Sequence, residues 1–422
     1  MKVIEQLLRD IPLPRMAKVR QHFHAPELAD TALAVRQALR QREVLKRIAP
    51  GDRVAIAVGS RGVADLPIIV REVVRAVKAQ GGQPFLVPAM GSHGGATAVG
   101  QIEVLRQLGV DEETVEARII SSMEVVEVGR LANGLPVYTD RQAYEADKVI
   151  VINRIKPHTA FRGPVESGLM KMITIGLGKQ KGAEAAHAYS FKYMAEHVPE
   201  MAKQVLKRVP IIFGVGTLEN AYDRPAKIVA VPAEKLAEEE PLLLAEAKKL
   251  MPKLLLSPID VLIVDQIGKD ISGDGMDPNI TGRYATPYAS GGPEVSRIVV
   301  LGLTEKTHGN ANGIGLADVT TRKLFGQIAW EKGYANALTS TVTEVVKLPM
   351  IMDTEELAVK AAIKTCNVRD LTQVRVVRIR NTLELREIWI SKSLLPEAQE
   401  RADVEVTSGL CEMTWDAIDV RS

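Results

Sequence analysis

Cysteine is scarce in this chain, which contains only Cys366 and Cys411 and no CxxC pair. Two isolated cysteines supply neither the disulfide framework of a small secreted domain nor the ligands of a structural zinc site. The chain also lacks any run of about 18 uncharged apolar residues, so we expect no membrane-spanning helix. Its N-terminus has no apolar core of the kind found in signal peptides. We therefore expect a cytoplasmic protein that does not bind membranes.

Blocks of like charge are missing too, and the formal net charge is only +2. A nucleic-acid-binding protein usually carries a basic patch, so we expect no nucleic acid among the partners. The sequence shows no pair of catalytic carboxylates and no nucleophile elbow, which argues against a glycosidase and a serine hydrolase. No GxGxxG follows a predicted strand, and GVGT at 214–217 lacks the third glycine of that motif.

The chain has enough length and apolar content for two cores. Its 422 residues are 46% hydrophobic and 25% charged, which is typical of globular proteins. From residue 53, short apolar runs alternate with amphipathic segments, a pattern typical of an α/β domain with a largely parallel sheet. A second α/β set begins between residues 255 and 275. We expect domains at 1–262 and 263–422, with the active site in the cleft between them.

Polar residues follow three predicted strands of the first domain, at the point where each strand ends. Ser60 and Arg61 follow the first strand, His93 follows the second and His158 follows the third. Because the carboxyl ends of parallel strands share one edge of a sheet, these groups should converge there. The predicted strands cover residues 53–59, 83–90 and 148–155.

Further unusual residues follow His158. Lys171 lies in an apolar run, where an amine held away from water would be uncharged and could act as a nucleophile. The glycine-rich segment 176–182 offers Lys179, Lys181 and backbone amides, as phosphate sites do, although it is not a P-loop. His187 comes soon after it.

Each feature alone has a simpler structural explanation. The glycines around His93 could only allow a tight turn, Arg61 could form a surface ion pair, and Lys171 could extend out of its apolar run into water. Together they form a plausible active site, because histidines exchange protons near neutral pH and an arginine binds a carboxylate with two hydrogen bonds. Structural or surface roles are expected for His22, His24, His197 and His308.

At these residues the chain resembles the nickel-pincer lactate racemase family. That family has an arginine after its first strand, a GxHxxxT-type turn, a Pro-His pair after a buried strand, a lysine, and a histidine sixteen positions after the lysine. The corresponding residues here are Arg61, Gly91 to Thr97 with His93, Pro157–His158, Lys171 and His187. The resemblance extends over most of the chain and is strongest from residue 53 to about 190.

The resemblance implies a specific chemistry. Lys171 would be joined as a thioamide to a pyridinium mononucleotide that carries sulfur ligands, and His187 would be the protein ligand of its nickel. His93 and His158 would act in turn as base and acid on the substrate hydroxyl while hydride leaves and returns to C2. Arg61, with Ser60, would hold the substrate carboxylate. The remaining implied contacts are Lys179 and Lys181 to the cofactor phosphate, and Gln266, Lys269 and Trp330 to the substrate from the second domain.

Two departures from the family pattern bear on the substrate. Val58 replaces an acidic residue, and the loop between His158 and Lys171 is longer than in the family. We therefore expect a racemase or epimerase of some 2-hydroxy acid, with cofactor-biosynthesis enzymes as maturation partners. Two alternatives stay open: a dehydrogenase or lyase that uses a diffusible NAD-type nucleotide, and a binding homologue without catalysis. The glycine-rich segment 268–292 is predicted to be a lid or hinge.

Overall fold

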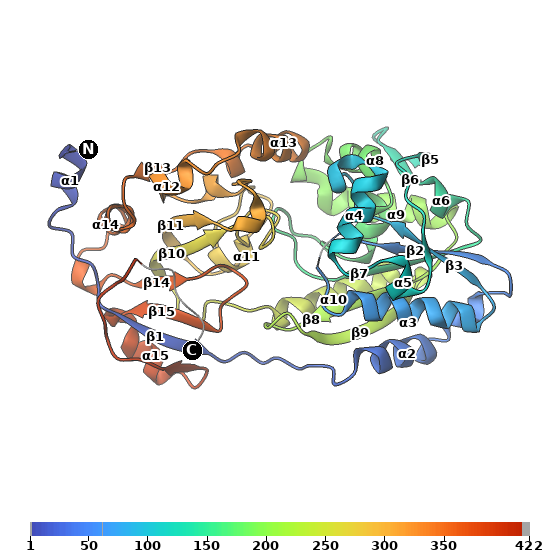
Figure 1. Cartoon of the computed structure of the whole chain (residues 1–422), viewed down its shortest axis with the longest axis horizontal. Helices are drawn as coiled ribbons and strands as arrows, with labels where there is room; N and C mark the ends of the chain where they lie inside the picture. The colour runs from blue at the N-terminus through green and yellow to red at the C-terminus, as the bar shows by residue number, and fades with distance from the viewer. Residues whose placement is uncertain (1, 61, 416–422) are drawn as a thin grey trace. The chain divides into compact units, whose positions relative to one another are not determined.

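The computed structural model describes residues 2–60 and 62–415, which form two compact units (Figure 1). The first unit is the continuous segment His24–Met251. The second unit combines the chain up to Phe23 with the chain from Pro252 onward.

The division differs from the single boundary that we expected after residue 262. That position lies inside strand β10 (Ile259–Ile267), and the N-terminal segment belongs to the second unit. The reason is the antiparallel pairing of β1 (Met16–Gln21) with β15 (Glu387–Ser391) and β16 (Val404–Val406). Such long-range pairing leaves no local pattern in the sequence.

A six-stranded sheet forms the centre of the first unit, in the order β4-β3-β2-β7-β8-β9. Its strands are parallel except β9, which pairs antiparallel with β8, so the expected largely parallel α/β sheet is confirmed. β2 is buried at every residue but its first, and β7 is apolar and buried from Val149 to Ile152, as strands covered on both faces are. The strands are β2 (Arg53–Val58), β3 (Gln83–Pro88), β4 (Arg118–Ile119), β7 (Lys148–Arg154), β8 (Ile211–Glu219) and β9 (Pro225–Pro232).

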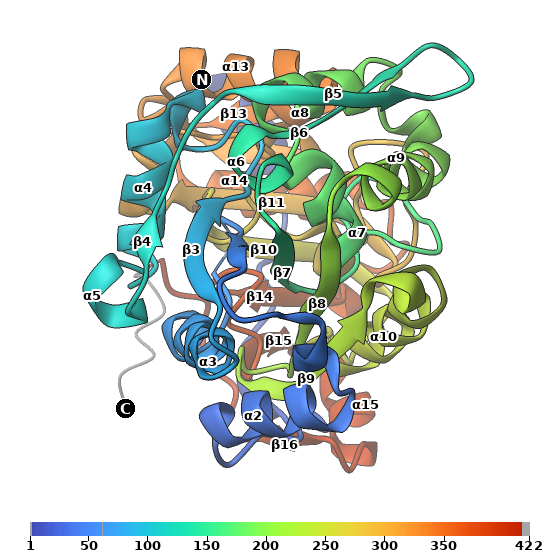
Figure 2. The same cartoon turned by 90° about the vertical axis from the view of Figure 1, so that its right-hand side faces the viewer.

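Helices α2 (Thr31–Gln41) and α3 (Leu66–Ala79) cover one face of this sheet (Figure 2). Buried side chains from both helices, such as Leu39 and Val73, share one core with Ile56 of β2. Because side chains alternate along a strand, every second residue of β2 points into this core and the others face the opposite layer.

The opposite face of the sheet is covered by α7 (Leu169–Lys171) and α10 (Leu236–Leu250). α7 packs closely on β8 at Gly214, where an added Cβ would lie 2.9 Å from a methyl group of Leu169. The absence of a side chain at this position lets α7 approach the strand. Other elements of the first unit are α4 (Ala98–Gln107), α5 (Glu112–Val115), β5 (Val125–Arg130), β6 (Pro136–Asp140), α6 (Arg141–Tyr144), the π-helix η3 (Met172–Gly176), α8 (Lys179–His187) and α9 (Met194–Arg208).

The second unit contains an eight-stranded sheet in the order β13-β12-β11-β10-β14-β15-β1-β16. The pairs from β13 to β14 are parallel and the pairs from β14 to β16 are antiparallel. Helix α14 packs on the parallel part with an apolar core, and α1 packs against α14. The remaining elements are α1 (Lys2–Leu8), α11 (Pro278–Thr281), β11 (Val295–Leu303), β12 (Val319–Thr321), α12 (Arg322–Phe325), α13 (Trp330–Ser340), β13 (Met350–Met352), α14 (Glu355–Thr365), β14 (Val376–Ile379) and α15 (Leu395–Glu400).

None of the helices within residues 2–60 and 62–415 is long and apolar enough to cross a membrane.

The core of the first unit should be sensitive to loss of volume. Ile56 is 0% exposed, so Ile56→Ala is expected to lower the free energy of unfolding by about 2–5 kcal/mol in urea titrations. Val99, which is 78% exposed, provides the control, because Val99→Ala should change the same quantity by no more than about 0.5 kcal/mol. Equal effects of the two substitutions would contradict the placement of this core.

Candidate active site

The carboxyl ends of β2 and β3 bring two of the expected residues into contact. Ser60 lies just after β2, His93 lies in the turn after β3, and the Ser60 hydroxyl forms a hydrogen bond with His93 Nδ1. This contact holds the imidazole by its Nδ1 atom. Arg61 lies outside the described residues.

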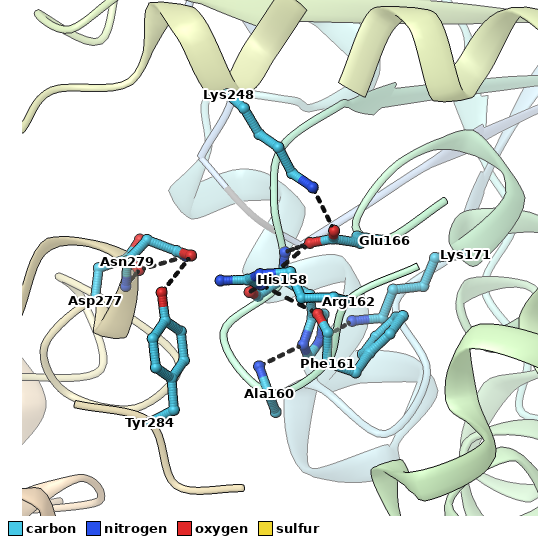
Figure 3. Close-up of polar contacts among 10 residues, drawn as sticks. All are labelled: His158, Ala160, Phe161, Arg162, Glu166, Lys171, Lys248, Asp277, Asn279 and Tyr284. Carbon is cyan, nitrogen blue, oxygen red and sulfur yellow. Dashed lines mark hydrogen bonds and ion pairs between the residues drawn. The ribbon is translucent and has the colours of Figure 1, made fainter. Parts of the chain in front are cut away.

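His158, beyond the neighbouring strand β7, contacts Lys171. Its Nδ1 accepts a hydrogen bond from the Ala160 backbone N–H at 3.0 Å, and its Nε2 lies 2.7 Å from Lys171 Nζ (Figure 3). Because Nδ1 is an acceptor, the proton of the neutral ring is on Nε2. That N–H can donate only to an amine that has a free lone pair. The geometry therefore favours an uncharged amine at Lys171.

A buried carboxylate fixes the loop that carries His158. The Glu166 side chain is 0% exposed, and its Oε2 accepts from the His158 backbone N–H at 2.7 Å and from Arg162 Nη1 at 3.3 Å (Figure 3). Lys248 Nζ of α10 donates to Oε1 of the same carboxylate at 2.6 Å. Arg162 also donates to the His158 carbonyl oxygen at 2.6 Å. Both backbone groups of His158 are thus held.

The same loop is closed at its base. Lys156 and Ser167 exchange backbone hydrogen bonds of 2.8 and 3.1 Å, and Asn153 Nδ2 of β7 donates to the Gly168 carbonyl at 2.8 Å. The loop between His158 and Lys171 is therefore held at its base by backbone and side-chain hydrogen bonds.

His187 occupies the last position of α8 and is partly exposed. Its Nδ1–H donates to the Ala183 carbonyl oxygen at 2.7 Å, which places the lone pair of the neutral ring on Nε2. Burial lowers the pKa of His187, and the hydrogen bond to Ala183 opposes part of that shift. A neutral imidazole whose other nitrogen is held by a carbonyl is the usual form of a histidine that ligates a metal.

Phe191 links the two histidines. Its ring centroid lies 5.6 Å from that of His158 and 5.3 Å from that of His187. His158, Lys171 and His187 therefore form one cluster with an aromatic wall. Phe191 was not among the expected site residues, because one phenylalanine after a helix gives no sequence signal.

A metal at this cluster would need ligands from a bound group. Within residues 2–60 and 62–415, no group of three or more His, Cys, Asp or Glu side chains is arranged to hold a metal ion. These described residues therefore cannot complete the coordination of a metal ion by themselves. Such a site suits a cofactor that brings its own ligands and does not suit a metal held by protein alone.

Lys179 forms a buried ion pair and buried hydrogen bonds within the protein. Its ammonium is 0% exposed, lies 3.2 Å from an Asp140 oxygen, and donates to Gln101 Oε1 at 3.0 Å and to the Pro88 carbonyl. Burial lowers the pKa of Lys179 and raises that of Asp140, while their mutual attraction opposes both shifts. Lys179 therefore joins the end of β3 to the start of α6, and we remove it from the set of phosphate-binding candidates. Lys181, in contrast, is exposed.

The other expected residues lie in the second unit. Gln266 belongs to β10, and Lys269 donates to the Gly273 carbonyl oxygen at 2.6 Å. Trp330 begins α13, with its ring 5.5 Å from Phe325 and 5.9 Å from Tyr334 between centroids. The predicted lid segment contains its own polar cluster: Asp277 accepts from the Asn279 backbone and side chain at 2.9 and 2.8 Å, and Tyr284 donates to Asn279 at 3.2 Å (Figure 3).

Comparison with known proteins finds one matching domain and one similar fold. Residues 5–198 match the family model described as the lactate racemase N-terminal domain. Among solved structures, the chain is similar to the lactate racemase apoprotein from Thermoanaerobacterium thermosaccharolyticum. The TM-score is 0.51 at 12% identity, covering 86% of this chain and 94% of that chain. A search of curated proteins finds no match. Residues 5–198 thus match a lactate racemase N-terminal domain, and the chain has the fold of the lactate racemase apoprotein, which supports the resemblance seen in its sequence.

One buried carboxylate behind the cluster should make stability depend on pH. Glu240 is 0% exposed, and burial raises its pKa from 4.5 to about 7 against the opposing effect of backbone N–H groups. Between these values the folded chain keeps the proton that the unfolded chain has lost, so this group's contribution to stability falls as pH rises from 4.5 to about 7.

Glu240→Gln should remove that dependence. The free energy of unfolding of the variant minus that of the wild type is expected to rise between pH 4.5 and about 7 and then to stay constant. Urea titrations of both proteins across this range measure it. A difference that is constant with pH would show that Glu240 does not titrate in this way.

Proposed function

We propose that this protein is a cytoplasmic racemase or epimerase that inverts C2 of a 2-hydroxy acid, with a nickel-pincer nucleotide attached to Lys171. The observation that carries the proposal is the 2.7 Å hydrogen bond between His158 Nε2 and Lys171 Nζ, beside the partly exposed His187. The lactate racemase domain and fold support the reaction class.

Lys171 would anchor the cofactor through its amine. A lysine must lose its charge before it can attack a carbonyl-type carbon, and the tautomer of His158 favours that state. When bound, the cofactor would supply the centre that takes hydride from C2 and gives it back.

His187 would ligate the nickel through Nε2. Imidazole is a suitable ligand for this metal, and the Nδ1–H bond to Ala183 fixes the ring plane. The lowered pKa of His187 keeps the ring neutral, as ligation requires.

His93 and His158 would handle the hydroxyl proton. One imidazole would remove this proton and an imidazolium would return it. Ser60 orients His93, and the Glu166 network orients His158. We assign the substrate carboxylate to Arg61, with Ser60 beside it.

Further contacts are proposed for the remaining candidates. Gln266, Lys269 and Trp330 of the second unit would complete the substrate site, and Lys181 would contribute to phosphate binding. Cofactor-biosynthesis enzymes would be the maturation partners.

The attachment can be tested by intact mass. Protein co-expressed with the cofactor-making enzymes should carry an adduct and nickel, and Lys171→Ala should carry no adduct. Lys203→Ala is the control, because Lys203 is an exposed lysine of α9 and should not affect loading. Wild-type protein with neither adduct nor nickel under these conditions would overturn the proposed function.

The roles of the histidines can be separated by metal content and activity. His93→Gln and His158→Gln should lower racemisation, followed by chiral chromatography on a panel of 2-hydroxy acids, by about 10²–10⁴-fold while nickel stays bound. His187→Ala should keep the adduct and lose nickel. Nickel loss in the first two variants would mean that the roles are wrongly assigned.

A further inference from the structure

Helix α10 carries two charged side chains that reach the segment between His158 and Lys171. Glu240, near its start, accepts a hydrogen bond from the Met170 backbone N–H at 2.9 Å. Lys248, near its end, forms the 2.6 Å ion pair with Glu166. One helix thus contacts both the loop that positions His158 and the helix that carries Lys171.

We propose that α10 sets the position of Lys171 relative to His158. Glu240 is the positioning residue for the lysine. Lys248 acts through Glu166 as the positioning residue for the histidine. The proposal rests on the proposed function in one respect, that Lys171 is the reactive amine. It adds how this chain holds that amine in place.

Glu240 replaces a local helix cap. The first N–H groups of a helix have no partner within it, and a side chain at the preceding position usually accepts from one of them. That position here is Gly168, which has no side chain. An added Cβ on Gly168 would lie 2.1 Å from Glu240 Oε1, so glycine is required beside this carboxylate. The N-terminus of α7 is therefore capped by Glu240 of α10 and not by the residue that precedes the helix.

Stability alone does not explain this glutamate. Its Oε1 is buried and has no hydrogen-bond partner among the described residues. A buried carboxylate with an unsatisfied oxygen costs free energy, and the raised pKa of Glu240 reflects that cost. A group kept at a cost next to a reactive lysine is better explained by its effect on the site.

The second contact acts on the histidine. Glu166 and Arg162 bind the N–H and the carbonyl of His158, and Lys248 holds Glu166 from α10 (Figure 3). The ring then reaches Lys171 with Nε2. Movement of either attachment on α10 would lengthen the 2.7 Å bond that favours the uncharged amine.

The test uses the full chain without cofactor and trinitrobenzenesulfonate as the probe. Only an uncharged amine displaces its sulfite group, and peptide mass spectrometry follows the labelling rates of Lys171 and of exposed Lys203 in the same sample. Glu240→Leu and Lys248→Met should slow labelling of Lys171 by about tenfold for each unit by which its pKa rises, with Lys203 unchanged. Glu240→Gln keeps an oxygen for the Met170 N–H and should label at nearly the wild-type rate.

Lys227→Met is the matched control. It removes the exposed 2.7 Å ion pair with Glu246, which lies on the same helix, and should leave the Lys171 rate unchanged. Wild-type rates in both Glu240→Leu and Lys248→Met, or equal slowing in Lys227→Met, would overturn the proposal. If Glu240→Leu does not fold by near-UV circular dichroism, Lys248→Met decides, because its side chain is 40% exposed. Since the readout needs no cofactor, its failure is distinct from failure of the racemase proposal.

Discussion

The hydrogen bond between His158 Nε2 and Lys171 Nζ is the interaction on which the site depends. It joins two segments that are otherwise separate, the loop after β7 and the short helix α7. Which atom donates depends on the tautomer of the histidine, and the Ala160 N–H, which donates to Nδ1, favours the tautomer with the proton on Nε2. The Glu166 network, the closed base of the loop and the cap from Glu240 all hold these two residues in place.

The parts of the site that sequence predicted are those that follow from local pattern and topology. Apolar runs locate β2, β3 and β7, and the geometry of parallel strands places Ser60 and His93 at one edge. The residues that hold the site were not predictable in this way. Lys248 pairs with Glu166 across 82 positions and Glu240 with Met170 across 70. From sequence alone, a charged residue on an amphipathic helix is expected to face solvent.

Lys179 illustrates the same limit in the opposite direction. A lysine within a glycine-rich segment resembles a phosphate-binding residue by composition, but the fold buries its ammonium against Asp140. Such a pair is expensive to remove from water and is tolerated because Gln101 and the Pro88 carbonyl complete its hydrogen bonds. The pair connects the strand that leads to His93 with the hairpin β5–β6. The charge that appeared to be available for a ligand serves instead to hold the scaffold.

The π-helix after Lys171 explains how the His93 turn and the Lys171 segment come together. Wide π turns are rare and occur often at functional sites. In η3, Gly176 lies so close to the end of β3 that an added Cβ would be 2.7 Å from the Ala89 carbonyl oxygen. Its own carbonyl accepts from the Gly91 N–H at 3.1 Å, two residues before His93. The segment from Lys171 to Gly176 thus contacts both acid/base candidates, His158 through Lys171 and the turn that carries His93 through Gly176. A side chain at Gly176 would push these segments apart, and Gly91, with a φ of +59°, has a backbone conformation that favours glycine, so both glycines help to form the site.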